Sequence, residues 1–538
     1  MKTKIYISLF TITILLLSAC DDYLDVEPDN RVMIDTPEKV QQLLINSYPA
    51  VNYATVAELS SDNFIDNNAP NSKGLYFNQP SFDRLDDDVF AWEDPKTSSD
   101  NGSPYDIWQE YYQSIASANA ALQAIDEIIR KGVSDETLNK MLLPSKGEAL
   151  MIRAYSHFML VNIFSKAYKD VGRSQSDMGV LYVTEPVDVV ITESKRNSVT
   201  EVYEWIAKDI EAGIDLISND AYRVPKYHFN INAAHAFAAQ FYLFKRDYPK
   251  VIAHANYVLG TNPSNVLRDW ETIYNNAEQQ TYAYISTDEP ANLLILPTNS
   301  TFFRRFMNYR YGYNGDAQRG TINDSGPTWS GRAPFANGWM WTFSANFGSF
   351  LAKIIEQFEY TDRVAGIGYA HIVRTEYTTD ATLLDRAEAY IFTGEIDKAV
   401  ADLQAWNKSH RATRELTKEA ITGFYTPGRT FFSYTFHTQE LSPDFLVTAD
   451  QKPYIDCVLH FRRLERIFEG HRWFDIKRYG IEIEHVVGRG ANRILLTYDD
   501  DRRAIQIPSD VVGAGVEPNP RENLLSNDPA KMPMYRID

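Results

Sequence analysis

Hydrophobic residues recur every three or four positions along much of the chain, and this spacing predicts helices. Between residues 107 and 129 they form one continuous face, as in an amphipathic helix. That face consists of Ile107, Tyr111, Ile115, Ala118, Leu122, Ile125 and Ile129. A second segment, about 148–164, is apolar on nearly all sides, which predicts a buried helix. A third begins with the capping box Ser198-Val199-Thr200-Glu201 and continues as an amphipathic helix to about Ile217.

Two later segments repeat one pattern of small, aromatic and turn positions. In the clearer copy, Ala387, Tyr390, Gly394, Ala399 and Leu403 fall at spacings typical of a tetratricopeptide repeat. Small residues let two helices pack closely, and a glycine permits the tight turn between them. A similar pattern occurs earlier, between residues 239 and 255. We therefore expect an all-α scaffold of tetratricopeptide-like helix pairs with long irregular loops.

Helical periodicity is lost between residues 261 and 350, which are rich in glycine, asparagine, proline and aromatic residues. A comparable aromatic patch covers residues 76–108. Long irregular segments of compact domains commonly carry function, and aromatic rings combine a flat apolar face with a polar handle. We expect two or three of the following rings to bind a ligand: Trp92, Tyr309, Tyr311, Tyr313, Trp329, Trp339 and Trp341.

The first twenty residues resemble a lipoprotein export signal. Two lysines precede an apolar run, residues 5–17, which is shorter than the ~20 residues that a membrane-spanning helix needs but suits a signal peptide. The run ends in Leu17-Ser18-Ala19-Cys20, which resembles the lipobox of bacterial lipoproteins. We expect residues 1–19 to be the signal peptide, Cys20 to carry a lipid, and residues 20–30 to form an acidic tether. An ordinary secretory peptide with a chance cysteine is the alternative.

Charge and cysteine content narrow the class of protein further. The formal net charge of −19 argues against nucleic acid as a partner. Besides Cys20 the chain has one cysteine, Cys457, so lipidation of Cys20 leaves no intramolecular disulfide. A chain of 538 residues is nevertheless long enough to bury a large core.

Motifs for catalysis or metal binding are weak. Glu469, His471, Arg472 and Asp475 cluster in sequence, but no third orienting group is evident. Their apolar neighbours favour a structural role in which Arg472 pairs with Asp475 at i, i+3. The sequence has no metal motif of histidines or cysteines, and we predict no metal and no cofactor. The acidic run 83–94 has the oxygen ligands that Ca²⁺ prefers, although a solvated loop is the commoner fate of such a run.

Several segments, in chain order, resemble the SusD/RagB family of nutrient-uptake lipoproteins of Gram-negative bacteria. The most specific is residues 469–480, which closely resemble the family signature E-G-x-R-W-F-D-L-x-R-W-G. Residues 108–119 are similar to the family's W-x3-Y-x2-I-x2-A-N helix, and residues 148–158 to its E-A…R-A…F helix. The tail at 507–523 is similar to its closing I-P…N-P…N. The family's usual Gly and Pro after Phe164 are replaced by Ser165-Lys166-Ala167-Tyr168.

The resemblance implies a SusD-like helical scaffold. Its regions would be an N-terminal helical part at 31–260, the aromatic- and glycine-rich loop part at 261–350 and a C-terminal SusD/RagB part at 351–538. It also implies a lipid-anchored protein on the outer face of the outer membrane. There it would capture a glycan or a peptide and deliver it to a SusC-type, TonB-dependent transporter, without being an enzyme.

Two other functions stay open at this point. The first is a lipid-anchored α-helical glycoside hydrolase, which requires two inward carboxylates roughly 5–10 Å apart. The second is a scaffold lipoprotein that binds only proteins.

Overall fold

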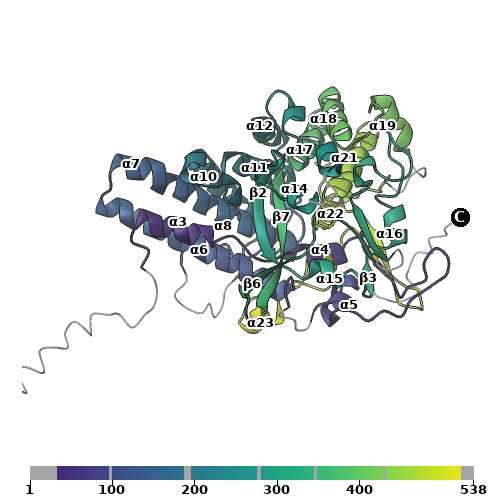
Figure 1. Cartoon of the computed structure of the whole chain (residues 1–538), viewed down its shortest axis with the longest axis horizontal. Coiled ribbons are helices and arrows are strands. Elements are labelled where there is room, and N and C mark those ends of the chain that lie inside the picture. Colours follow the sequence, from purple (N-terminus) through teal and green to yellow (C-terminus); the bar gives the residue numbers. More distant parts are fainter. Residues whose placement is uncertain are drawn as a thin grey trace, which may run out of the picture.

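The computed structural model describes residues 33–95, 100–186, 195–275, 280–344, 348–426, 428 and 432–522. The predicted signal peptide, Cys20 and the tether at 20–30 lie outside these residues. Helices dominate the described part, and a few short sheets lie among them (Figure 1). Within that part, none of the helices is both long enough and apolar enough to cross a membrane.

Long helices from the first half of the chain lie side by side (Figure 1): α3 (Pro37–Ile45), α6 (Pro104–Lys131), α8 (Leu143–Phe164) and α10 (Val199–Gly213). The predicted helices at 107–129 and 148–164 are confirmed by α6 and α8, and α8 is buried on almost all sides. The predicted capping box also forms. The Glu201 amide donates to the Ser198 hydroxyl, and the Ser198 amide donates to the Glu201 carboxylate.

A second group of helices packs in sequence order. It comprises α11 (Ile231–Lys245), α12 (Tyr248–Leu259), α17 (Thr379–Phe392), α18 (Ile396–Ser409), α21 (Lys452–Glu465) and α22 (His471–Tyr479). Helix α11 contacts α12, α12 contacts α17, and α17 contacts α18 and α21. Gly394 has a φ of +80° in the turn between α17 and α18, as a predicted tight turn requires. The tetratricopeptide register of these pairs, and the division into three regions, stay predictions.

Short helices connect these groups. They are α4 (Ala54–Leu59), α5 (Arg84–Phe90), α7 (Asp135–Thr137), α9 (Val171–Ser174), α13 (Trp270–Asn275), α14 (Gln280–Tyr284), α15 (Phe302–Arg305), α16 (Gly315–Arg319), α19 (Lys418–Phe424), α20 (Thr438–Leu441) and α23 (Ser509–Gly513).

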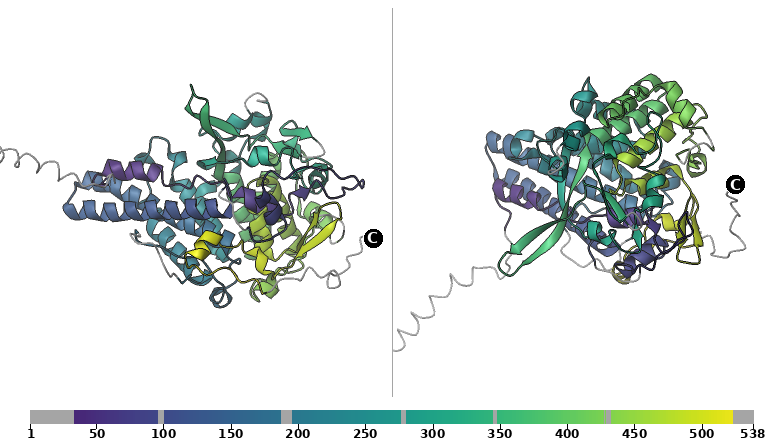
Figure 2. Two further views of the ribbon diagram at one scale, coloured as in Figure 1. Left: turned by 90° about the horizontal axis from the view of Figure 1, so that it is seen from below. Right: turned by 45° about the vertical axis from the view of Figure 1, so that its right-hand side comes forward.

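The described residues also form four small antiparallel sheets, which the expected all-α class does not include. The largest has the order β2-β7-β6, with β2 (Asn292–Asn299), β7 (Ile367–Thr378) and β6 (Gln357–Asp362). Beyond the body of the molecule, β6 and β7 continue as a protruding hairpin (Figure 2). The two-stranded sheets pair β1 (Ile65–Asp66) with β3 (Tyr311–Gly312), β4 (Met340–Ser344) with β5 (Gly348–Leu351), and β8 (Ile483–Val487) with β9 (Asn492–Leu496). Short apolar runs such as β2 do not reveal by periodicity alone which structure they adopt.

The family-like signature at 469–480 is part of the core. Gly470, with a φ of +83°, lies so close to α4 that a Cβ there would be 2.9 Å from the Cβ of Ala57. Arg472 donates two hydrogen bonds to Asp62, at 2.7 and 2.8 Å. Asp475 accepts from Arg462 and Arg478 instead, so the predicted Arg472–Asp475 pair is wrong. These buried pairings support the structural role expected for the signature.

The acidic run at 83–94 is not a solvated loop. Asp83 caps α5, and Asp86 bonds to Arg305 at 2.6 Å in the interior. Asp87 accepts from Arg310 at 2.9 Å, and Asp94 pairs with Arg521 at 2.8 Å. These carboxylates thus already bind guanidinium and backbone amide groups. Few carboxylate oxygens of the run are therefore left to bind a calcium ion.

Candidate functional site

Five of the seven predicted ligand-binding rings are core residues: Trp92, Tyr311, Tyr313, Trp329 and Trp339. The Trp92 ring stacks on His485, and its indole N–H donates to the carbonyl of Ser60 at 3.0 Å. The Tyr311 hydroxyl donates to Asp87 at 2.7 Å. A ligand could stack on these rings only if the core opened, so our expectation that they face a loop-built surface is wrong. The segment around them folds inward because its apolar rings pack against distant helices and strands.

The other two rings have different positions. Tyr309 is half-buried, and its ring packs edge-on against Phe82 with centroids 5.0 Å apart. Trp341 lies in β4 opposite Phe350, and its side chain lies outside what the structure describes. Tyr309 does not line the cavities described next.

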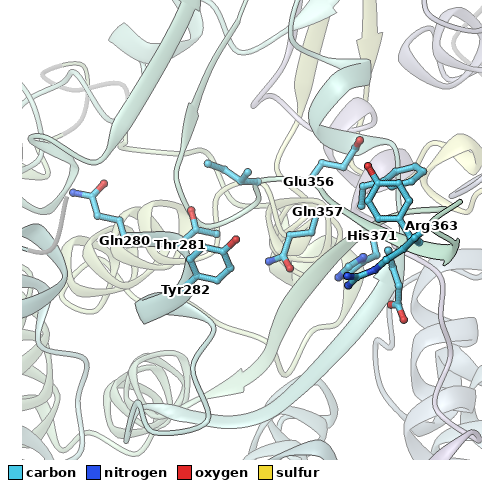
Figure 3. A pocket seen from close by; sticks show the side chains of 11 residues that line it. Gln280, Thr281, Tyr282, Glu356, Gln357, Arg363 and His371 are labelled. Atoms are coloured by element: carbon cyan, nitrogen blue, oxygen red, sulfur yellow. The ribbon is translucent and has the colours of Figure 1, made fainter. Parts of the chain in front are cut away.

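Two adjoining cavities flank the base of the β6–β7 hairpin. The first, of ≈ 640 Å³, lies between α14 and the hairpin. In Figure 3, Gln280, Thr281 and Tyr282 line it from one side, and Gln357, Arg363 and His371 from the other. The second, of ≈ 1180 Å³, lies over one face of the β2-β7-β6 sheet. Gln357, Glu359 and His371 line both cavities, which therefore adjoin, and we call the two together the hairpin groove.

Three exposed aromatic rings surround the first cavity. Tyr282 on α14 is 64% exposed, and Phe358 and Tyr360 on β6 are 45% and 52% exposed. Phe358 and Tyr360 lie two positions apart on one strand and therefore point to the same face. Their ring centroids are 4.9 Å apart. Together the three rings provide a flat apolar surface, and none of them is among the seven predicted rings.

Gly368 makes room for this aromatic face. It lies opposite Tyr360 in the hairpin, and the neighbouring partner of Phe358 is the small residue Ala370. A Cβ at position 368 would lie 2.7 Å from the Phe358 ring and 2.0 Å from the carbonyl oxygen of Glu359. Any larger residue there would displace the ring or the strand pairing.

Two polar groups at the junction of the cavities have no hydrogen-bond partner among the described residues. They are the amide nitrogen of Gln357 and Nδ1 of His371, whose residues face each other across β6 and β7. Buried polar groups nearly always have a hydrogen-bond partner in native proteins. Two buried groups without one therefore indicate that water or a ligand binds there. Because both residues line the hairpin groove, these two groups are available to hydrogen-bond a polar ligand there.

The carboxylates of the first cavity are held in place by neighbours. Glu356 forms a bidentate ion pair with Arg304, and Glu359 accepts a hydrogen bond from the Tyr369 hydroxyl at 3.0 Å. Fixed acceptors of this kind suit the hydroxyl groups of a bound ligand.

A hydrogen-bonded hub stiffens the wall of the second cavity. Glu148, from α8, accepts hydrogen bonds from the hydroxyls of Tyr48 and Tyr222 and contacts His228 Nδ1 at 2.8 Å. The rings of Tyr222 and His228 stack with centroids 4.0 Å apart. The exposed ring of Tyr227 lies beside them on the rim. This wall of the second cavity is thus preformed in the absence of a ligand.

Among the described residues, Asp380, His410 and Glu465 form one buried group whose geometry could hold a metal ion. Indole N–H groups already donate to it, from Trp270 to His410 Nε2 and from Trp406 to Glu465, both at 2.9 Å. The backbone amide of Arg268 donates to Asp380. Since protein donors satisfy these atoms, we interpret the group as a structural network.

The sequence offered one usable signal for the hairpin groove. Residues 357–360, Gln-Phe-Glu-Tyr, alternate polar and aromatic side chains. This is the period of a strand with two different faces. Nothing local places Tyr282 of α14 opposite that strand, because only the packing of distant segments brings them together.

A mainly helical scaffold with an open groove lined by aromatic and polar side chains defines a ligand-binding class of protein. Two family models match successive parts of the chain. The model described as "Starch-binding associating with outer membrane" matches residues 22–243, and the model described as "SusD family" matches residues 265–510. The chain belongs to the SusD/RagB family, whose members are carbohydrate-binding proteins associated with the outer membrane.

Solved structures share the fold. A SusD superfamily protein from Bacteroides thetaiotaomicron has a TM-score of 0.61 at 18% identity, covering 90% of this chain and all of that one. A SusD-like carbohydrate binding protein from Bacteroides vulgatus has a TM-score of 0.56 at 13% identity, over 93% and 99% of the two chains. A laminarin binding SusD-like protein has a TM-score of 0.54 at 15% identity, over 90% and 99%. A search among curated proteins found no match.

Proposed function

We propose that this protein is a substrate-binding lipoprotein of the cell surface that captures an extracellular glycan in the hairpin groove. The observation that carries the proposal is the trio of exposed rings, Tyr282, Phe358 and Tyr360, beside unpaired polar groups of Gln357 and His371. Sugars bind by laying an apolar C–H face on such rings while their hydroxyls bond to nearby polar groups. The carbohydrate-binding relatives and the family description support the same ligand class.

The proposal includes the cellular context that the sequence implied. A lipid on Cys20 holds the protein at the outer membrane, facing the exterior, and the acidic tether at 20–30 separates it from the bilayer. Bound glycan passes to a SusC-type, TonB-dependent transporter, and the protein itself performs no catalysis. Glu356 and Glu359, held by Arg304 and Tyr369, serve as hydrogen-bond acceptors for the bound glycan.

A peptide is the second candidate ligand, favoured by one observation. In the sheet order β2-β7-β6, strand β6 is an edge strand, so its outer backbone groups have no strand partner in that sheet. An extended peptide can add to such an edge, and the rings would then receive its apolar side chains.

The test is binding of glycan and peptide libraries to the mature chain in detergent, followed by calorimetry on any ligand found. The triple variant Tyr282→Ala, Phe358→Ala, Tyr360→Ala is expected to bind a glycan at least about tenfold more weakly. The reason is that each aromatic contact contributes about 0.5–1.5 kcal/mol and about 1.4 kcal/mol is a factor of ten. The matched control replaces two exposed rings elsewhere, Trp205→Ala and Tyr76→Ala, and should bind as the wild type does.

Three results would count against the proposal. Glycan affinity that is unchanged in the triple variant would place the site outside the hairpin groove. Cleavage of bound oligosaccharide, abolished by a Glu or Asp substitution, would favour the hydrolase. Peptide binding without glycan binding would favour strand addition at β6.

A further inference from the structure

Two histidines from neighbouring helices face each other on the surface, away from the hairpin groove. His235 belongs to α11 and His254 to α12, two helices that pack together. Their Nδ1 atoms are 2.9 Å apart. Sequence patterns miss this pair, because the two residues are on different helices and do not form a spaced motif on one of them.

The separation of the two nitrogens is close to that of two imidazoles on one metal ion. Zn²⁺ binds histidine nitrogen at ~2.0–2.1 Å, so in tetrahedral geometry two such nitrogens are about 3.3 Å apart. To admit an ion, the two nitrogens must move apart by a few tenths of an ångström, and the rings must turn so that both lone pairs point to it. Both side chains are half-buried, so an ion can reach them from solvent and keep water ligands.

Aromatic neighbours hold both rings in this orientation. The His235 ring stacks on Tyr257 with centroids 3.9 Å apart and planes 16° apart. The His254 ring lies parallel to Tyr242, within 2°, at 5.6 Å. The Tyr242 hydroxyl is itself fixed by a 2.8 Å hydrogen bond to Glu211. Ligand rings that are already oriented lose little conformational entropy when they bind an ion.

The charges around the pair favour a cation. Burial, and the neighbouring ring, lower the pKa of His235 to about 4, and burial and Lys250 lower the pKa of His254. Both imidazoles are therefore neutral near pH 7, which is the form that binds metals. Asp215, an exposed carboxylate, acts electrostatically on both rings. Lys250 is the opposing charge, and Glu211 neutralises it at 2.6 Å.

We propose that His235 and His254 together bind one divalent transition-metal ion at the surface between α11 and α12. Imidazole ligands suit Zn²⁺, Cu²⁺ and Ni²⁺ rather than Ca²⁺ or Mg²⁺. Water supplies the remaining ligands, and Asp215 adds a favourable charge nearby. The ion ties α11 to α12, and it has no part in the glycan-binding proposal, so either proposal can fail alone.

The first test titrates the metal-free mature chain, prepared with a chelator, with ZnCl₂ by calorimetry. One ion is expected to bind per chain, and His235→Ala or His254→Ala should each weaken binding at least about tenfold, since each removes one of two nitrogen ligands. His437→Ala, a partly exposed histidine elsewhere, should leave binding unchanged. Equal Zn²⁺ affinity of the wild type and both alanine variants would overturn the proposal and leave the pair as a hydrogen bond between two imidazoles.

A second test requires no substitution and so does not depend on the variants folding. The electron paramagnetic resonance spectrum of one equivalent of Cu²⁺ on the wild-type chain should show coupling to two imidazole nitrogens. Binding of Zn²⁺ should also raise the melting temperature of the wild type, because a ligand of the folded state stabilises it. A Cu²⁺ spectrum without nitrogen coupling would overturn the proposal.

Discussion

At the scale of single residues, buried polar side chains are held in one chemical form by their neighbours. His157 in α8 shows this most directly. Its Nδ1–H donates to the carbonyl of Arg153 at 2.9 Å, and its Nε2 accepts from the amide of Val183 at 3.1 Å. The ring also stacks on Tyr182 with centroids 3.8 Å apart. These contacts require a neutral imidazole with its proton on Nδ1, because a protonated Nε2 could not accept.

This residue predicts a loss of stability in acid. Burial lowers the pKa of His157 to about 3, whereas the unfolded chain has a histidine pKa of 6.5. The unfolded state therefore binds more protons between these values. The contribution of His157 to the free energy of unfolding is complete above pH 6.5. It falls by up to about 1.4 kcal/mol per pH unit as the pH drops toward 3.

The measurement is urea denaturation of the wild type and His157→Gln between pH 7 and pH 4. The glutamine side chain does not titrate, so the variant should lose less stability over this interval than the wild type. Ser156→Ala, at the adjacent buried position, controls for altered packing and should keep the wild-type slope. Identical slopes for all three proteins would show that His157 is not the acid-sensitive group.

At the scale of elements, buried ion pairs join helices that are distant in sequence. Arg153 of α8 forms a bidentate pair with Asp209 of α10, at 2.7 and 2.6 Å. It also donates to Asn119 of α6 at 2.9 Å, and Tyr182 donates to Asp209 at 2.6 Å. Asn119 and Arg153 are two of the positions that resembled the family pattern. Their spacing in sequence thus reflects a contact among three helices.

We predict that replacing one partner of this ion pair destabilises the folded protein more than replacing both partners. Arg153→Met should lower the free energy of unfolding by about 3–5 kcal/mol, because Asp209 stays buried without its partner charge. Arg153→Met combined with Asp209→Leu should recover much of that loss. Lys140→Met, which breaks the exposed pair with Glu136, should change stability by less than about 1 kcal/mol. Denaturant unfolding measures the free energy of unfolding of all three variants. If Arg153→Met lowered it no more than Lys140→Met does, the prediction would be contradicted.

At the scale of the whole molecule, the hairpin groove is assembled from four separate stretches of chain. Its residues come from α3, from the segment 221–228, from β2 with α14, and from the β6–β7 hairpin. The hub at Glu148 fixes one wall, while the exposed rings of the hairpin form the other side. One side of the groove is thus rigid and internally bonded, and the other protrudes into solvent (Figure 2).

The overall charge predicts which glycans bind best. The chain carries a formal net charge of −19, and Glu356 and Glu359 lie at the first cavity. The field of the molecule therefore repels polyanionic polysaccharides. Neutral oligosaccharides should bind with an affinity independent of ionic strength. Matched sulfated or uronic-acid chains should bind more weakly, and better at 0.5 M than at 0.05 M salt, because salt screens the repulsion. Tighter binding of the anionic chains at low salt would refute this prediction.

The sequence by itself determined the features that depend on neighbouring residues. Apolar spacing predicted α6 and α8, and the Ser198 capping box predicted the start of α10, since helix periodicity and capping act within a few residues. The signature at 469–480 indicated the family, because its residues stand at consecutive positions. The lipid on Cys20 and the transporter partner are inferred from the sequence alone and stay proposals.

The tertiary structure alone decided which side chains meet and which face solvent. Trp339 and Tyr313 come from a stretch with the composition of a loop, yet they are buried, because burial depends on what distant segments pack over a residue. Tyr282 joins Phe358 and Tyr360, and His235 joins His254, for the same reason. Hydrophobic burial acts on surface area regardless of distance along the chain. A local pattern therefore predicts an element more reliably than it predicts a site.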